Sequence, residues 1–297
     1  MTAAMSYAPS FYVQSDEVQL AVYQRGNPAQ PTVIFIHGYP DNHEVWDKVV
    51  ALLEDEFHVV TYDVRGSGAS SLPKRIRDYT LAKLSQDLQA VMNAVSPDRP
   101  VHLVAHDWGS IQTWESVTDP ALQHRIASYS TLSGPCLDHV GKLLRRYISQ
   151  PNAEHLSYIM NQALHSWYIF MFQAPLLAPT IWRAGLAKHW HKVLAKIENV
   201  KHAEPNPNQL IDGVNGIQLY RANMLPRVLA PRARYSAVPI NLLVALDDHF
   251  VRPHLYNYLE EWAPNLERTE IQGGHWQLLL DQPEVFADAV RQFIKRY

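Results

Sequence analysis

The sequence predicts a protein of the α/β class, with a mostly parallel, eight-stranded sheet and an inserted helical cap. Three observations lead to this prediction. Apolar strands alternate with amphipathic helices through residues 1–135 and again through residues 237–297. The residues between these parts have a helical pattern rich in aromatic side chains. The stretch Val101–Ser110 joins a short apolar strand to a helical pattern through small residues. Strands and helices that alternate at this spacing are typical of a parallel sheet covered by helices.

Composition narrows the function classes. The 297 residues are 47% hydrophobic, enough to bury a sizeable core, and they carry a formal charge of −3. No long basic run is present, so we expect no nucleic-acid partner. Cys136 is the single cysteine, which excludes an internal disulfide and a cysteine metal cluster. The histidines lack the His-Glu-x-x-His spacing of a zinc site. We therefore expect neither a metal nor a cofactor.

The sequence also shows neither the features of a secretory signal nor those of a membrane span. Residues Met1–Ser10 lack the basic region and apolar run of a secretory signal. The most apolar long stretch, Ser166–Trp182, is too short and too interrupted by proline to span a membrane. We expect a cytoplasmic protein without a membrane span.

The first part of the core is predicted from runs of β-branched and aromatic residues and from two amphipathic segments. The runs between turn residues predict strands at Phe11–Val13, Val18–Tyr23, Thr32–Ile36 and His58–Tyr62, followed by the strand that opens Val101–Ser110. Apolar residues at helical spacing predict helices at Glu44–Glu54 and Leu81–Ala94.

A further strand is predicted at Ile126–Leu132, and the alternation then stops. It resumes with strands at Val238–Leu246 and Leu266–Ile271, a helix near Leu255–Trp262 and a last helix at Val285–Tyr297. That last helix has a continuous apolar stripe. The pattern therefore divides the chain into a core of residues 1–135 and 237–297 and a helical cap of residues 136–236.

The turn at Asp107 has the composition of a nucleophile elbow. Ala105 precedes it by two residues, and Gly109 and Ser110 follow it. A strand, a tight turn and a helix crowded together require small residues at these positions, as in the motif Gly-x-Ser-x-Gly. The apex here is aspartate. Asp107 could alternatively cap the following helix, which is a common role of aspartate.

An aspartate at the apex restricts the chemistry. A serine that attacked a saturated carbon would form an ether, which water does not easily cleave. A carboxylate that attacks the same carbon forms an ester, and water can then attack the carbonyl carbon of the aspartate and regenerate it. Asp107 therefore suits the opening of an epoxide or the displacement of a halide, and not an ordinary esterase, lipase or protease.

Two later clusters follow predicted strands. His275 comes behind two glycines after the last strand, and Asp247 and Asp248 follow the strand before it. The order nucleophile, acid, base is that of a hydrolase triad. We assign His275 as the general base for water, with a carboxylate that orients the ring. Either aspartate could be the acid; we prefer Asp248, which lies three residues after Ala245.

A third cluster, His37-Gly38-Tyr39-Pro40, ends the strand Thr32–Ile36. Ligands bind at the carboxyl edge of open α/β sheets, where all these clusters are expected to meet. We expect the backbone amides of Tyr39 and Trp108 to form an oxyanion hole at the Asp107 carboxyl. Taken alone, this turn would be an ordinary end of a strand.

The chain resembles epoxide hydrolases of the α/β-hydrolase fold over nearly its whole length. His37–Pro40 resembles the family's His-Gly-x-Pro motif, His106–Gly109 its nucleophile motif, and Asp63–Gly68 the loop after its fourth strand. Leu219–Met224 is most similar to the hydrolase half of actinobacterial epoxide hydrolases that are fused to a short-chain dehydrogenase. Because the sequence stops after the hydrolase half, we expect no dehydrogenase activity.

The resemblance also implies two tyrosines that polarise the epoxide oxygen from the cap. The segment Trp167–Pro175 resembles the family segment that carries the first, which assigns the role to Tyr168. Leu219-Tyr220-Arg221 resembles the segment that carries the second and assigns it to Tyr220. The chain contains fifteen tyrosines, and most cap tyrosines simply pack against neighbours.

The implied activity is that of an epoxide hydrolase, an ether-bond hydrolase that converts a small apolar epoxide and water into a vicinal diol. A haloalkane dehalogenase is the nearest alternative; it would need Trp108 with Trp167 or Trp182 as halide donors, and Asp138 could then be its acid. A non-catalytic binding module on the same fold is a further alternative. The sequence is compatible with a homodimer but does not determine the oligomeric state.

Overall fold

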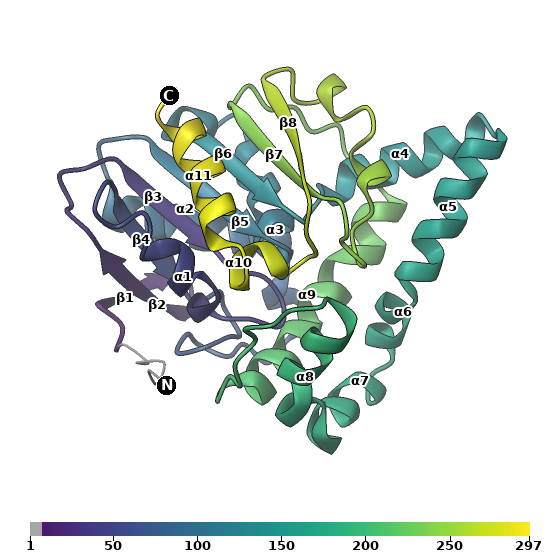
Figure 1. The fold of residues 1–297 in the computed structure, drawn as a ribbon, viewed down its shortest axis with the longest axis horizontal. Coiled ribbons are helices and arrows are strands. Elements are labelled where there is room, and N and C mark those ends of the chain that lie inside the picture. The colour runs from purple at the N-terminus through teal and green to yellow at the C-terminus, as the bar shows by residue number, and fades with distance from the viewer. Residues whose placement is uncertain (1–7) are drawn as a thin grey trace.

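The computed structural model describes residues 8–297, in which eight strands form one sheet with the order β1-β2-β4-β3-β5-β6-β7-β8 (Figure 1). The first two pairings, β1 with β2 and β2 with β4, are antiparallel, and all the others are parallel. The predicted mostly parallel, eight-stranded sheet is thus confirmed. The strands are β1 (Phe11–Ser15), β2 (Val18–Arg25), β3 (Thr32–Ile36), β4 (His58–Tyr62), β5 (Val101–His106), β6 (Ile126–Leu132), β7 (Ile240–Ala245) and β8 (Leu266–Ile271).

The sheet core follows from the alternation of side chains along each strand. Ile34 on β3 and Leu103 on β5 pack in one apolar cluster with helix α2 (Leu81–Val95). Val33 and Val104 point to the other face, where they pack with α1 (Asp47–Val50) and α11 (Pro283–Ile294). Because both faces are covered, every residue of β3, β4, β5 and β7 is buried. The central strand β5 leads directly into α3 (Trp108–Val117).

The chain between β6 and β7 forms helices, and these helices lie side by side beyond one edge of the core (Figure 1). Its long helix α9 contacts α4, α6, α7 and α8, so these helices form one packed unit. The helices are α4 (Leu137–Ser149), α5 (Ala153–His165), α6 (Trp167–Gln173), α7 (Leu177–Ile181), the π-helical turn η4 (Trp182–Leu186), α8 (Ala187–Ile197) and α9 (Gln209–Leu229).

Two predicted helices differ from the structure. The segment predicted as a helix at Glu44–Glu54 is a 3₁₀ turn, η1 (His43–Trp46), followed by the short helix α1 and further turns. The helix predicted near Leu255–Trp262 is wrong: this segment forms two 3₁₀ turns, η5 (Pro253–Tyr256) and η6 (Leu259–Glu261).

Contacts with α4 explain the break between η5 and η6. Asn257 has extended backbone and its side chain donates to the Tyr147 hydroxyl at 3.0 Å. Tyr258 adopts a left-handed conformation with φ of 63°, and its ring lies beneath the Arg146 guanidinium at 4.3 Å. These tertiary contacts fix the side chains of two residues whose backbone is not α-helical.

Helix α10 (Gln277–Leu280) starts just after the loop that carries His275 and precedes the last helix, α11. Within residues 8–297, no helix has both the length and the hydrophobicity needed to cross a membrane. The first seven residues of the predicted core segment 1–135, which include most of the Met1–Ser10 stretch, lie outside the described residues.

Candidate active site

The elbow places Asp107 in a conformation that L-residues rarely adopt. Its φ is 50° and its ψ is −123°, at the junction of β5 and α3. Gly109 makes the turn sterically feasible, because a Cβ at this position would lie 2.1 Å from the carbonyl oxygen of Ile36. The Asp107 side chain forms no capping hydrogen bond to α3. The structure therefore does not support the alternative in which Asp107 is only a helix cap, and strain of this kind is typical of functional sites.

The structure brings Asp107, His275 and Asp248 together from three strand ends. His275 Nδ1 donates to Asp248 Oδ2 at 2.9 Å. Its other nitrogen, Nε2, lies 3.5 Å from Asp107 Oδ2. Asp247 instead accepts a hydrogen bond from Gln272 at the surface. Asp248, and not Asp247, therefore faces the histidine.

In the buried pair of His275 and Asp248, each residue stabilises the charged form of the other. Burial by itself would lower the pKa of His275, but the charges of Asp248 and Asp107 and the hydrogen bond to Asp248 raise it well above its ordinary value. Burial would raise the pKa of Asp248, but His275 and the hydrogen bonds to its carboxylate lower it. Among those bonds, Oδ1 accepts from the backbone amides of Phe250 and Val251 at 2.7 and 2.8 Å. Asp248 is therefore held ionised and fixed in orientation.

The turn after β3 supplies a donor to the elbow carboxylate. The Tyr39 backbone N–H donates to Asp107 Oδ1 at 2.7 Å. Gly38 allows this approach, since a Cβ there would lie 2.5 Å from the same oxygen. Trp108 is the first residue of α3, and its backbone donation to the site stays a prediction. One of the two expected oxyanion donors thus already points at Asp107.

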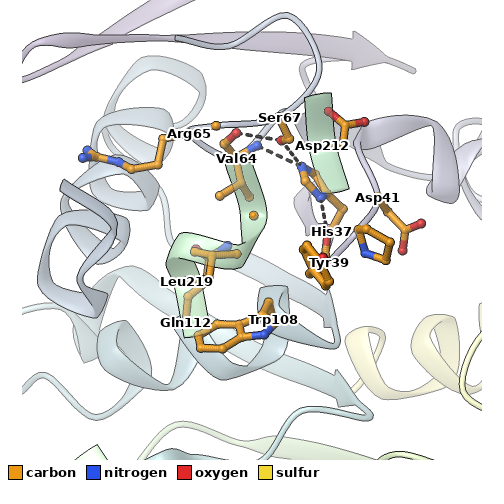
Figure 2. A pocket seen from close by; sticks show the side chains of 14 residues that line it. His37, Tyr39, Asp41, Val64, Arg65, Ser67, Trp108, Gln112, Asp212 and Leu219 are labelled. Atoms are coloured by element: carbon orange, nitrogen blue, oxygen red, sulfur yellow. Dashed lines mark hydrogen bonds between the residues drawn. The ribbon is translucent and has the colours of Figure 1, made fainter. Parts of the chain in front are cut away.

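His37 fixes the same turn from behind. Figure 2 shows its ring directed at the loop after β4, where Nε2 accepts from the Val64 amide at 2.9 Å and lies 3.1 Å from the Ser67 hydroxyl. Nδ1 donates to the Gly38 carbonyl at 2.9 Å. Burial lowers the pKa of His37 to about 4, so the ring is neutral at pH 7. The adjoining hollow, about 20 Å³, has room for roughly one water, so His37 supports the turn and does not border a substrate-sized cavity.

A larger cavity, of about 300 Å³, opens in front of Asp107. Tyr168 on α6 and Tyr220 on α9 both line it, with ring centroids 6.1 Å apart. Burial raises the pKa of both phenols, which keeps them protonated at pH 7. Most of the other lining is apolar: Trp108, Ile111, Pro135, Leu137, Val140, Leu144, Ile159, Ala163, Ile169, Phe170, Met224, Leu225, Val228, Phe250, Val251 and Leu255.

Of the residues that a dehalogenase would use, Trp108 lines the cavity, but the other candidates lie elsewhere. Trp182 is 2% exposed, and its indole N–H donates to the Tyr39 hydroxyl at 2.7 Å. Trp167 is 62% exposed on the outside of α6 and does not line the cavity. Asp138 accepts several hydrogen bonds from Arg232, the shortest at 2.6 Å, so it is paired with arginine and not with His275.

Sequence reasoning missed several polar groups around the base. His106 was part of the nucleophile motif but had no predicted role; its Nε2 donates to the His275 carbonyl at 2.9 Å. Asp41 accepts from the Trp276 indole at 2.8 Å, and burial raises the pKa of Asp41 to about 7. Glu198 accepts from the His275 backbone N–H at 2.7 Å. Glu198 and His275 lie far apart in the chain. The glycine at position 274, directly before His275, was therefore the only nearby sequence feature that reflects the contact with Glu198. In residues 8–297, no group of three or more His, Cys, Asp or Glu side chains is arranged to hold a metal ion.

Comparison with known proteins agrees with the fold. The model of the alpha/beta hydrolase fold family matches residues 31–282. The chain therefore belongs to this family. The fold is also that of a Bacillus megaterium epoxide hydrolase solved in complex with an inhibitor, with a TM-score of 0.78 at 19% identity over 96% of this chain and 100% of that one.

Among relatives by sequence, a Mycobacterium tuberculosis protein named Probable oxidoreductase EphD is 36% identical over 287 residues. The match covers 94% of this chain and 48% of that protein, so the chain spans about half the length of this relative. Epoxide hydrolase 3 of Xenopus tropicalis is 25% identical over 302 residues, which cover 91% of this chain and 73% of that protein.

Proposed function

We propose that the protein is an epoxide hydrolase that opens a small apolar epoxide to a vicinal diol. The observation that carries this proposal is the position of Asp107 at a largely apolar cavity that two protonated tyrosines also line. The cavity offers a carboxylate for the carbon and two phenols for the oxygen of the same three-membered ring. The name of the Xenopus relative, Epoxide hydrolase 3, agrees with this reaction class.

The first half-reaction forms an ester on Asp107. Oδ1 is held by the Tyr39 amide, which leaves Oδ2 as the attacking oxygen. Oδ2 bonds to an epoxide carbon while the carbon–oxygen bond of the ring breaks. The departing oxygen takes a proton from Tyr168 or Tyr220, and the other phenol donates a hydrogen bond. The product is a hydroxyalkyl ester and one phenolate.

The second half-reaction hydrolyses that ester. His275 takes a proton from water, which attacks the carboxyl carbon of Asp107, and Asp248 stabilises the imidazolium. The negative oxygen of the tetrahedral intermediate lies where Tyr39 N–H, and by prediction Trp108 N–H, can donate. Collapse releases the diol. The two protons of water end on the diol oxygen and on the phenolate, so the enzyme returns to its starting state.

Several finer assignments belong to the same proposal. Residues 136–236 would act as the cap that carries both tyrosines, over a core of residues 1–135 and 237–297. Epoxide and water would be the only reactants, with neither metal nor cofactor. A cytoplasmic location and a homodimer stay predictions.

A parallel assay tests the proposed activity. Wild-type protein is incubated with a panel of apolar epoxides and, separately, with primary haloalkanes, while diol formation and halide release are measured. We expect diol from at least one epoxide and no halide. Halide release without diol would favour a dehalogenase that uses the same triad. Neither product, from a protein whose folding is verified by circular dichroism, would favour a binding module.

A further inference from the structure

We propose that Glu198 is a positioning residue for the base: it anchors the His275 loop from the helical segment and raises the proton affinity of the imidazole. The inference extends the proposed function, since it concerns the same base, but its main test does not require a substrate. No sequence motif considered above contains Glu198.

The end of α8 directs Glu198 into the core. Its backbone N–H donates to the Leu194 carbonyl at 2.9 Å and closes the last turn of the helix. Asn199 then adopts a left-handed conformation with φ of 53° and ends the helix. The buried Val200 follows, so the chain turns inward at this point. As a result, the Glu198 side chain has no exposed surface.

The Glu198 carboxylate is bound to the base loop. Oε2 accepts the His275 backbone N–H at 2.7 Å. A Cβ on residue 274 would lie only 2.6 Å from this oxygen, which explains why a glycine precedes His275. From the other side, His106 Nε2 donates to the His275 carbonyl at 2.9 Å. Both backbone polar groups of His275 are therefore held by side chains, and one of these side chains comes from the segment between β6 and β7.

The other carboxylate oxygen also faces the triad loops. Oε1 lies 3.1 Å from Nδ1 of His249, the residue after Asp248, whose side chain is 54% exposed. Otherwise Oε1 is buried with no hydrogen-bond donor within residues 8–297. A buried carboxylate with so few donors is costly unless a nearby positive charge compensates it. Burial raises the pKa of Glu198, and the positive charge of His275 partly offsets this rise; by the same interaction an ionised Glu198 favours the protonated form of His275.

The adjoining residues provide a matched control. The amides of Lys201 and His202 donate to the two oxygens of Asp281, at 2.8 and 2.9 Å. Asp281 therefore holds the same segment against the core through a second carboxylate, and among residues 8–297 its hydrogen bonds do not include one to His275. Loss of Asp281 should loosen the segment without changing the electrostatics of the base.

An NMR titration of the His275 ring tests the inference directly. The Cε1–H signal is assigned by its loss in H275Q and followed from pH 5 to pH 10 in wild type, E198Q and D281N. Gln retains an oxygen that can accept the His275 N–H but removes the charge. We expect the pKa of His275 to fall by at least about half a pH unit in E198Q and to stay within error in D281N. An unchanged pKa in E198Q, or an equal fall in D281N, would overturn the proposed role.

Kinetics provide the second readout. Adduct hydrolysis requires neutral His275, so the acidic limb of its pH profile should move to lower pH in E198Q. In E198A, which also loses the acceptor, the plateau rate of hydrolysis should fall about ten-fold or more while ester formation stays near wild type. Wild-type protein that makes no diol would overturn the proposed function alone, since the NMR titration still decides the role of Glu198. Diol formation with an unshifted E198Q profile would overturn the role of Glu198 alone.

Discussion

Nε2 of His275 lies 3.5 Å from Oδ2 of Asp107, while Nδ1 of the same ring is held by Asp248 at 2.9 Å. The ring thus directs one nitrogen at the elbow carboxylate and the other at the acid. A water that attacks the carboxyl carbon of Asp107 would approach from the side of Nε2. This relationship separates the roles of the residues, because the base is needed for hydrolysis of the ester and not for its formation.

Replacement of the base should trap the ester. General-base assistance is typically worth ~10²–10⁴-fold, so H275Q should form the adduct and hydrolyse it slowly. Intact-protein mass spectrometry after mixing with a good epoxide should show an increase equal to the mass of the whole epoxide. Digestion should place it on the peptide that contains Asp107. A folded H275Q that turns epoxide over at the wild-type rate would contradict the two-step mechanism.

Oxygen isotopes should identify the attacking atom. In a single turnover in heavy-oxygen water with enzyme in excess, the new diol oxygen comes from Asp107 and should be light. The heavy atom should remain in the Asp107 carboxylate and enter the diol only in later turnovers. Mass spectrometry of the diol and of the peptide measures both. A heavy diol at the first turnover would mean that water attacks the epoxide directly and that Asp107 acts as a base.

The two phenols should contribute to ester formation. By analogy with oxyanion donors, loss of one should cost on the order of ten- to a thousand-fold in rate. Y168F and Y220F should each be slower in single-turnover ester formation, and the double variant should be nearly inactive. Tyr235, which is exposed and does not line the cavity, provides the control variant Y235F. Wild-type turnover by the double variant would remove the main reason to prefer an epoxide over a halide.

The His275–Asp248 pair should make stability depend on pH in a defined direction. The folded-state pKa of His275 is raised above its ordinary 6.5, so its contribution is complete below that value and is lost as pH rises through the folded-state pKa. The pKa of Asp248 is lowered from 3.8, so its contribution is present above that value and is lost as pH falls through the folded-state pKa. The difference in unfolding free energy between wild type and D248N should therefore be largest between about pH 4 and 6.5.

Urea unfolding of both proteins at pH 5.5 and at alkaline pH measures this difference. D248N also weakens the hydrogen bonds to the amides of Phe250 and Val251, but those amides do not titrate, and their loss should be equal at both pH values. A difference that stays constant or grows toward alkaline pH would contradict the predicted polarity of the pair.

The local sequence pattern was sufficient to predict the sheet and to predict which residues lie together at the site. Apolar runs such as Val101–His106 are buried on both faces, and this requirement is visible in composition alone. Small residues around Asp107 indicated the elbow because steric exclusion at a tight turn acts on immediate neighbours. Parallel strands end at one edge, so the sequence alone predicts that Asp107, His275 and the two aspartates lie near one another.

Tertiary structure decided what depends on distant segments. It placed Asp248 beside His275 and Asp247 at the surface, a choice that two adjacent identical residues do not reveal locally. It divided the predicted helix at residues 255–262 through contacts with α4. It brought Glu198 to the backbone of His275 across 77 positions of the chain. Such hydrogen bonds form only when separate elements pack against one another. The residue pattern within one strand or helix reflects interactions along that element and does not identify its distant partners.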